Sequence, residues 1–119
     1  MGVHNDLGKR GEILAVAHLK KKGYSILQRN YRFRKGEIDI IAAKGEILAI
    51  VEVKSRSSVD FEPIAGTVGR KKIGLLVQAA DQYVTSQNPG LQVRFDIITI
   101  YFKGSRYEVD HLEDAFYFF

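Results

Sequence analysis

Two carboxylates and a lysine interrupt strongly apolar sequence between residues 36 and 56. Asp39 lies within GEIDII, and Glu52 and Lys54 lie within VEVKSR. The surrounding residues are typical of buried β-strands, where an ionised group is costly unless it is paired or binds a metal. Carboxylate oxygens are ligands that Mg²⁺ prefers, and a neighbouring ammonium can hold a water molecule or stabilise negative charge. The pattern predicts metal-assisted hydrolysis of a phosphodiester.

A β-hairpin would bring these three side chains together. The Lys-Gly dipeptide at 44–45 is a turn signal between two apolar runs. A hairpin symmetric about this dipeptide places Asp39 opposite Ile50, with Glu52 as its diagonal neighbour on the same face, about 7–8 Å away between Cβ atoms. Lys54 follows one pleat further along. Asp39 and Glu52 are therefore predicted to hold Mg²⁺ or Mn²⁺, and Lys54 to orient or deprotonate the attacking water.

A further acid precedes the hairpin. Glu12 shares a helical stripe with Ala15 and Leu19, so its side chain points toward packed structure. It is a candidate third carboxylate of the metal site, and the alternative is favourable placement near a helix N-terminus. For Lys54, the structural alternative is a salt bridge within the sheet to one carboxylate, which leaves the other carboxylate without a partner. Glu37 is a weaker candidate because it lies at the mouth of the hairpin.

Composition and charge fit a folded protein with a polyanionic partner. The chain has 119 residues, of which 45% are hydrophobic and 27% charged, and it has no cysteine. It has neither an apolar run of the ~18 residues that a membrane helix needs nor a secretory leader, so we expect one cytoplasmic domain spanning 1–119. Residues 1–72 contain 15 Lys/Arg against 8 Asp/Glu, whereas residues 73–119 contain 3 against 6. The basic part indicates nucleic acid, and the alternative is a solvated surface.

Basic side chains cluster around the predicted site. Cations at 70–72 open a helix, where they oppose the helix dipole unless an anion such as a phosphate binds nearby. Solvated side chains are the alternative there. Backbone contacts of this kind position a protein without reading base sequence. The residues predicted to contact nucleic acid are Lys9, Arg10, Arg34, Lys35, Arg56, Arg70, Lys71 and Lys72.

Periodicity predicts the order α-β-β-β-α-β-β. Apolar residues with helical spacing end at Gly23 in the first case and at Asn88-Pro89-Gly90 in the second. Alternating or continuous apolar runs indicate five strands. The arrangement predicts an α/β fold with a mixed sheet and helices packed on it. The expected helices are 7–22 and 69–86, and the expected strands are 24–33, 36–43, 46–55, 92–102 and 106–110.

The motifs resemble those of a known nuclease group. Asp39 and Glu52-Val53-Lys54, preceded by Glu12, resemble the PD-(D/E)xK superfamily, with Ile38 in place of the proline. More closely, the chain resembles the bacterial YraN-like family of small proteins regarded as endonucleases, which is similar to archaeal Holliday junction resolvases. The matching segments are GKRGE at 8–12, KKGYSILQRNYR at 21–32, GEIDII at 36–41, VEVKSR at 51–56, GRKK at 69–72 and RFD at 94–96.

The resemblance implies a restriction-endonuclease-like fold and a role for each acid. Asp39 and Glu52 would be metal ligands, Lys54 the catalytic lysine and Glu12 an accessory acid. We expect a metal-dependent endonuclease that cleaves DNA, selecting branched recombination or repair structures over sequence. A two-fold symmetric junction would require a homodimer. The rival hypotheses are a non-catalytic nucleic-acid-binding module that assists recombination or repair, and a nuclease acting on RNA.

Overall fold

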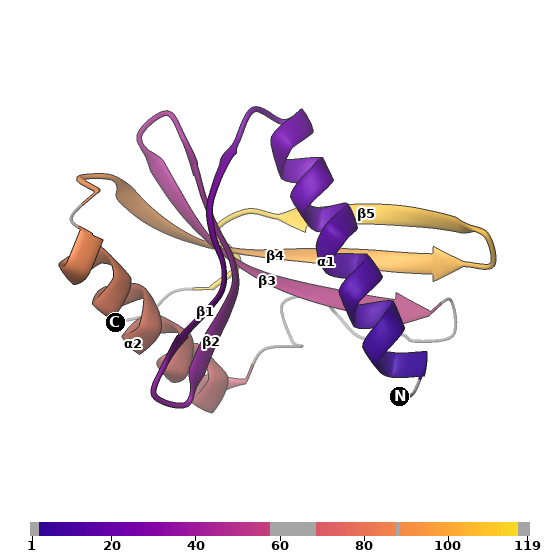
Figure 1. Ribbon diagram of the computed structural model, residues 1–119, viewed down its shortest axis with the longest axis horizontal. Helices are drawn as coiled ribbons and strands as arrows, with labels where there is room; N and C mark the ends of the chain where they lie inside the picture. The colour runs from indigo at the N-terminus through magenta and orange to yellow at the C-terminus, as the bar shows by residue number, and fades with distance from the viewer. Residues whose placement is uncertain (1–2, 58–68, 88, 117–119) are drawn as a thin grey trace.

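The predicted α/β fold is confirmed. The computed structural model describes residues 3–57, 69–87 and 89–116, with side chains from residue 7 onward. A five-stranded mixed sheet carries two helices in the predicted order α-β-β-β-α-β-β (Figure 1). Within the described residues, no helix is both long enough and apolar enough to cross a membrane. The elements are α1 (Val3–Lys21), β1 (Ser25–Phe33), β2 (Gly36–Lys44), β3 (Ile47–Ser57), α2 (Arg70–Gln87), β4 (Gln92–Lys103) and β5 (Arg106–Leu112).

The strands follow one another across the sheet in chain order. Neighbouring strands are antiparallel except β3 and β4, which are parallel and are joined through α2. A parallel pair requires such a crossover connection, which explains why a helix interrupts the strands here. β3 is therefore the central strand. It pairs with β4 over Ile47–Ser57 but with β2 only as far as Val51, and it carries Glu52 and Lys54 just beyond that point.

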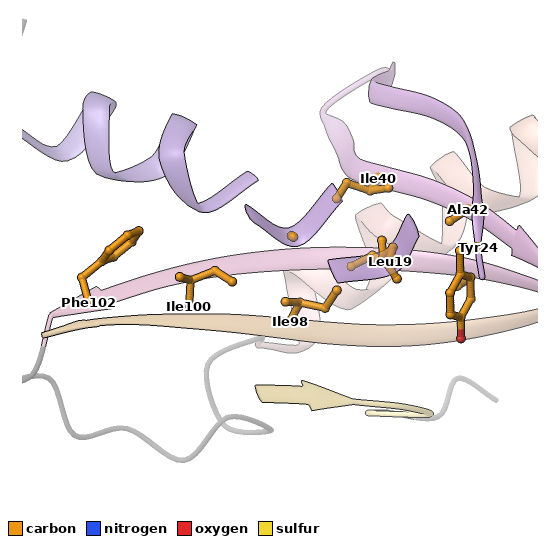
Figure 2. Packing of buried hydrophobic residues seen from close by; sticks show 10 residues of the cluster. Leu19, Tyr24, Ile40, Ala42, Ile98, Ile100 and Phe102 are labelled. Carbon is orange, nitrogen blue, oxygen red and sulfur yellow. The ribbon is translucent and has the colours of Figure 1, made fainter. Parts of the chain in front are cut away.

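Each helix covers its own hydrophobic cluster. Ala15 and Leu19 of α1 pack on inward-facing residues of β2, β3 and β4, including Ile98 and Ile100 (Figure 2). On the α2 side, a second cluster joins that helix to apolar residues of the same strands. The buried face of α2 consists of Leu76, Ala79, Ala80 and Tyr83.

The register of the β2–β3 hairpin differs from the predicted one. Lys44 pairs with Ile47 and Ile40 with Val51, so the turn residues are Gly45 and Glu46. Gly45 has a φ of 58°, which suits the first central position of a type II′ hairpin turn. The prediction that Asp39 lies opposite Ile50 is wrong by two residues, because the turn is centred one residue later than Lys44-Gly45. A shift of two residues preserves the facing of every side chain, so Asp39 and Glu52 still lie together.

The C-terminal apolar segment, of which residues 117–119 lie outside the described part, begins by packing on β4. The amide of Ala115 donates a 2.7 Å hydrogen bond to the carbonyl of Phe95. Phe116 stacks on the ring of Phe95, with 5.2 Å between centroids. Both residues contribute to the α2-side cluster.

Candidate active site

The site lies where the β2–β3 ladder ends. The last backbone pair is Ile40 with Val51, so Asp39 and Glu52 form the next, unpaired step. There the carboxylate of Asp39 takes the place of a backbone carbonyl. Its Oδ2 accepts a 2.8 Å hydrogen bond from the amide of Val53. Beyond this step β2 and β3 no longer pair through their backbones, and the Asp39 side chain makes the contact between the two strands.

An irregularity in β2 accompanies this separation. Ile38 packs in the α2-side cluster and Ile40 in the α1-side cluster, although residues two apart on a regular strand share a face. On the neighbouring strand, Asn30 lies between the partners of these two isoleucines and has a φ of 53°. A positive φ in a non-glycine residue within a strand marks a local break, and here it lies opposite Asp39.

Glu52 is a buried carboxylate held between two lysines. Its side chain is only 3% exposed. The Lys54 Nζ lies 3.7 Å from Glu52 Oε2, and the Lys72 Nζ from α2 makes a closer ion pair with the same oxygen. Burying a carboxylate requires such compensation, because the loss of solvation in a protein interior costs on the order of several kcal/mol per ion. The salt bridge considered for Lys54 thus exists, and a second one from α2 supplements it.

Asp39 and Glu52 share a proton. Burial raises the pKa of Asp39, and its hydrogen bond with Glu52 and the negative charge of Glu52 raise it further, to about 8. Burial also acts to raise the pKa of Glu52, but its contacts with Asp39 and Lys72 outweigh burial, so the pKa of Glu52 is lowered. At neutral pH Asp39 is therefore the protonated member of the pair and Glu52 the ionised one.

The two lysines are shifted in opposite directions. Burial lowers the pKa of Lys54, and the neighbouring positive charge of Lys72 lowers it further against the attraction of Glu52. For Lys72, the contact with Glu52 outweighs burial, so its pKa is raised. Lys54 is thus the ammonium that loses its proton more readily, as a group that assists a nucleophilic water should. Lys72, whose pKa is raised, keeps its positive charge and is the counter-ion of Glu52.

An open cleft gives access to the dyad. It has a volume of about 520 Å³ and lies between the β1–β2 turn, the end of the β2–β3 ladder and the start of α2. Gly36 allows α2 to approach closely, because a Cβ there would lie 2.4 Å from the carbonyl oxygen of Leu75. The cleft is lined by Lys35, Gly36, Glu37, Asp39, Glu52, Gly69, Lys71, Lys72, Leu75 and Leu76.

Glu12 approaches the dyad from α1 without joining it. Burial raises the pKa of Glu12, Arg29 lowers it, and the charges of Glu37 and Glu52 raise it. Its Oε1 lies 3.9 Å from Arg29 Nη2. Among the described residues, no three His, Cys, Asp or Glu side chains are grouped closely enough to hold one ion. Glu12 is thus within electrostatic range of the site, and its role as a third ligand stays a prediction.

The predicted nucleic-acid contacts divide into two groups. Lys35, Lys71 and Lys72 line the cleft. Arg10 lies elsewhere, with its guanidinium 4.9 Å from the centroid of Phe102. The remaining members do not line the cleft. Arg34 is an exposed turn residue over Phe33, Arg56 is half-buried and donates to the carbonyl of Ser55, and Lys9 and Arg70 are exposed. Glu37 lines the cleft and pairs with Arg32.

Sequence reasoning missed the contact between Lys72 and Glu52. Lys72 was predicted to bind phosphate, because a cation in the first turn of a helix opposes the helix dipole. That unfavourable placement was the available signal, since it called for a nearby anion. Glu52, buried and requiring compensation, is that anion in the structure.

A second polar network lies outside the cleft and has a structural character. Asp96 is fully buried, and Arg94 donates to both of its oxygens at 2.8 and 2.7 Å. His111 lies 2.8 Å from Asp96 Oδ2 and 3.2 Å from His18 of α1. The amide of Asp114 donates to Asp96 as well. The network joins α1, β4, β5 and the chain after β5, with Asp96 as its buried acid.

The dyad has the properties that a divalent cation requires. Asp39 and Glu52 offer hard oxygen ligands, which Mg²⁺ and Mn²⁺ prefer. Glu52 Oε2 is buried, and the positive charges of two ammonium groups lie beside it, so this position already favours a cation. The residues present therefore fit such an ion, with Asp39 and Glu52 as the ligands from this chain.

Comparison with known proteins places the chain in a family. Residues 11–100 match the model described as uncharacterised protein family UPF0102. The chain belongs to the UPF0102 family. The matched range contains Glu12, Asp39, Glu52, Lys54 and Lys72.

Relatives in the UPF0102 family match over nearly their whole length. A UPF0102 protein of Flavobacterium psychrophilum is 55% identical over 119 residues, which is 100% of both chains. One from Flavobacterium johnsoniae is 46% identical over 123 aligned positions, again covering 100% of both. One from Bacteroides thetaiotaomicron is 45% identical over 98% of this chain and 97% of its own.

Proposed function

We propose that this protein is a metal-dependent endonuclease of the PD-(D/E)xK type that acts on DNA in the cytoplasm. The observation that carries the proposal is the pair formed by the buried Glu52 and the half-buried Asp39 at the end of the β2–β3 ladder, in contact with each other and open to a cleft. An acid whose pKa is raised by burial weakens the fold at neutral pH, which is a cost that a functional role would explain. Shifts of this kind are typical of functional sites.

Each side chain has a defined task in the proposed reaction. A divalent ion held by Asp39 and Glu52 would polarise the phosphodiester and lower the pKa of a bound water. Lys54, whose own pKa is lowered, holds the attacking water and accepts or shares its proton. Lys35 from the β1–β2 turn and Lys71 from the start of α2 both line the cleft, and we assign them to phosphates that flank the scissile bond.

The substrate class follows from the character of the cleft. The lysines that line it can contact phosphates, and phosphate contacts do not read bases. We therefore propose structure-selective cleavage of branched recombination or repair DNA. If the substrate is a two-fold symmetric junction, two copies of the chain are required, one site for each strand.

A cleavage assay with matched variants tests the proposal. Linear, flapped and four-way DNA, and RNA of the same shapes, are incubated with Mg²⁺ or Mn²⁺. Glu52→Gln should abolish cleavage yet leave DNA binding equal or tighter, because it removes a negative charge from the path of the phosphates. Glu46→Gln, at the exposed turn of the same hairpin, is the control and should cleave normally. Tight DNA binding without cleavage of any substrate would instead identify a non-catalytic binding module. Cleavage of RNA alone would identify a nuclease that acts on RNA and would contradict the assignment to DNA.

A further inference from the structure

Lys72 has a position that ordinary phosphate binding does not explain. It reaches from the first turn of α2 to the buried Oε2 of Glu52, with which it forms an ion pair. This oxygen belongs to one of the two carboxylates that the proposed function assigns to a divalent cation. The Lys72 ammonium neutralises this oxygen and so supplies the positive charge that the divalent cation would otherwise supply. The two cations therefore compete for the same carboxylate.

Of the two lysines at Glu52, Lys72 is the one able to leave. Its side chain is 47% exposed, whereas that of Lys54 is 16% exposed. Lys54 is also fixed by the central strand β3, two residues after Glu52, at 3.7 Å from Oε2. Lys72 has a flexible stem at the cleft edge and can turn toward solvent or toward a phosphate. Its displacement leaves Lys54 in place.

We infer that Lys72 is a tethered cation that competes with the divalent ion for Glu52, and that binding of the divalent ion frees Lys72 to bind the DNA backbone. The inference rests on the proposed function of this cleft. In the absence of metal, Lys72 keeps the buried Glu52 compensated. Once displaced, it adds a positive charge beside Lys71 at the edge of the cleft. Metal binding and DNA binding then strengthen each other, and this linkage must be reciprocal.

Metal titration of the full chain tests the competition. Mn²⁺ is titrated calorimetrically into the wild type and into Lys72→Gln in the same buffer. Lys72→Gln should bind Mn²⁺ about tenfold tighter, which corresponds to about 1.4 kcal/mol. Lys72→Arg, which keeps a cation in reach of Glu52, should bind as the wild type does. Lys71→Gln controls for the general loss of charge in the cleft and should change little. Unchanged or weaker binding by Lys72→Gln would overturn the inference.

DNA binding tests the second half of the inference. Fluorescence anisotropy with a labelled duplex is measured with and without Ca²⁺, a hard cation that also takes carboxylate oxygens. Ca²⁺ should tighten DNA binding several-fold more in the wild type than in Lys72→Gln, within the range of about 5–150-fold typical of coupled sites. Equal tightening in both proteins would refute the release of Lys72 toward DNA.

The outcomes separate this inference from the proposed function. If Lys72→Gln gains Mn²⁺ affinity and the wild type cleaves nothing, the competition stands and catalysis falls. If the wild type cleaves DNA and Lys72→Gln binds Mn²⁺ no more tightly, the proposed function stands and the competition falls. Failure of both proteins to bind Mn²⁺ contradicts both.

Discussion

Replacing Asp39 with asparagine should stabilise the protein at neutral pH while removing a ligand of the proposed metal site. Asparagine has the same shape, so its carbonyl oxygen can still accept the hydrogen bond from Val53 and its amide can donate to Glu52. It differs in having no proton to lose. The substitution therefore measures how much the raised pKa of Asp39 lowers the free energy of unfolding.

The magnitude follows from the pKa of Asp39, which rises from 3.8 to about 8 on folding. Each pKa unit is worth about 1.4 kcal/mol, so about three units felt at pH 7 amount to about 4 kcal/mol. The lowered pKa of Glu52 stabilises the folded state and offsets part of this cost. We therefore expect Asp39→Asn to raise the free energy of unfolding by about 2–4 kcal/mol. The folded state retains a proton that the unfolded chain has lost. The wild type is therefore most favoured below pH 3.8 and loses this stability as the pH rises to about 8.

Urea unfolding at a series of pH values measures the effect. The free energy of unfolding of Asp39→Asn should match that of the wild type near pH 3.8, exceed it increasingly with pH, and level off above pH 8. Asp110→Asn, an exposed change on β5, is the control. Added Mg²⁺ should stabilise the wild type and not Asp39→Asn, because only a folded state with a site gains from ligand binding. A loss of stability at pH 7, or a gain independent of pH, would refute the shared-proton description.

Three further predictions concern the framework of the site and its surface. Gly36→Ala should lower the free energy of unfolding by about 1–3 kcal/mol, because its Cβ meets the backbone of α2. A Cβ at Gly11 meets the side chain of Ser55, whose hydroxyl can rotate away, so Gly11→Ala should cost less in the same urea titration. Asp96→Asn should cost about 3–5 kcal/mol by thermal or urea unfolding, since it leaves the Arg94 guanidinium without its buried partner, and a neutral result would show the network to be dispensable. Arg70→Ala with Lys71→Ala should weaken DNA binding and flatten its salt dependence, and an unchanged salt slope would exclude both as phosphate contacts.

The sequence predicted which face of the sheet carries the two acids, but it did not predict the register of the β2–β3 hairpin. The hydrophobic pattern determines which side of the sheet a residue faces, and both Asp39 and Glu52 obey it. A shift of two residues leaves that pattern unchanged, so only the turn can fix the register. Gly45 is the first central residue of the turn and not the second, and the Lys-Gly dipeptide does not distinguish these alternatives.

The end of the ladder and the partners of Glu52 depend on tertiary structure. The break at Asp39 involves Asn30 on the neighbouring strand, which no local pattern around Asp39 reveals. Lys72 meets Glu52 only because Gly36 allows α2 to approach β2. In contrast, Arg94 and Asp96 are two residues apart on one strand, and their pairing was within reach of sequence reasoning.

Electron density from crystals soaked in Mn²⁺ would test the central claim most directly. An anomalous difference map identifies the ion without reference to activity. We expect a peak bound by the carboxylates of Asp39 and Glu52, with the Lys72 ammonium moved away from Glu52. A map with no peak at these two side chains at saturating Mn²⁺, or with the ion bound elsewhere, would contradict it.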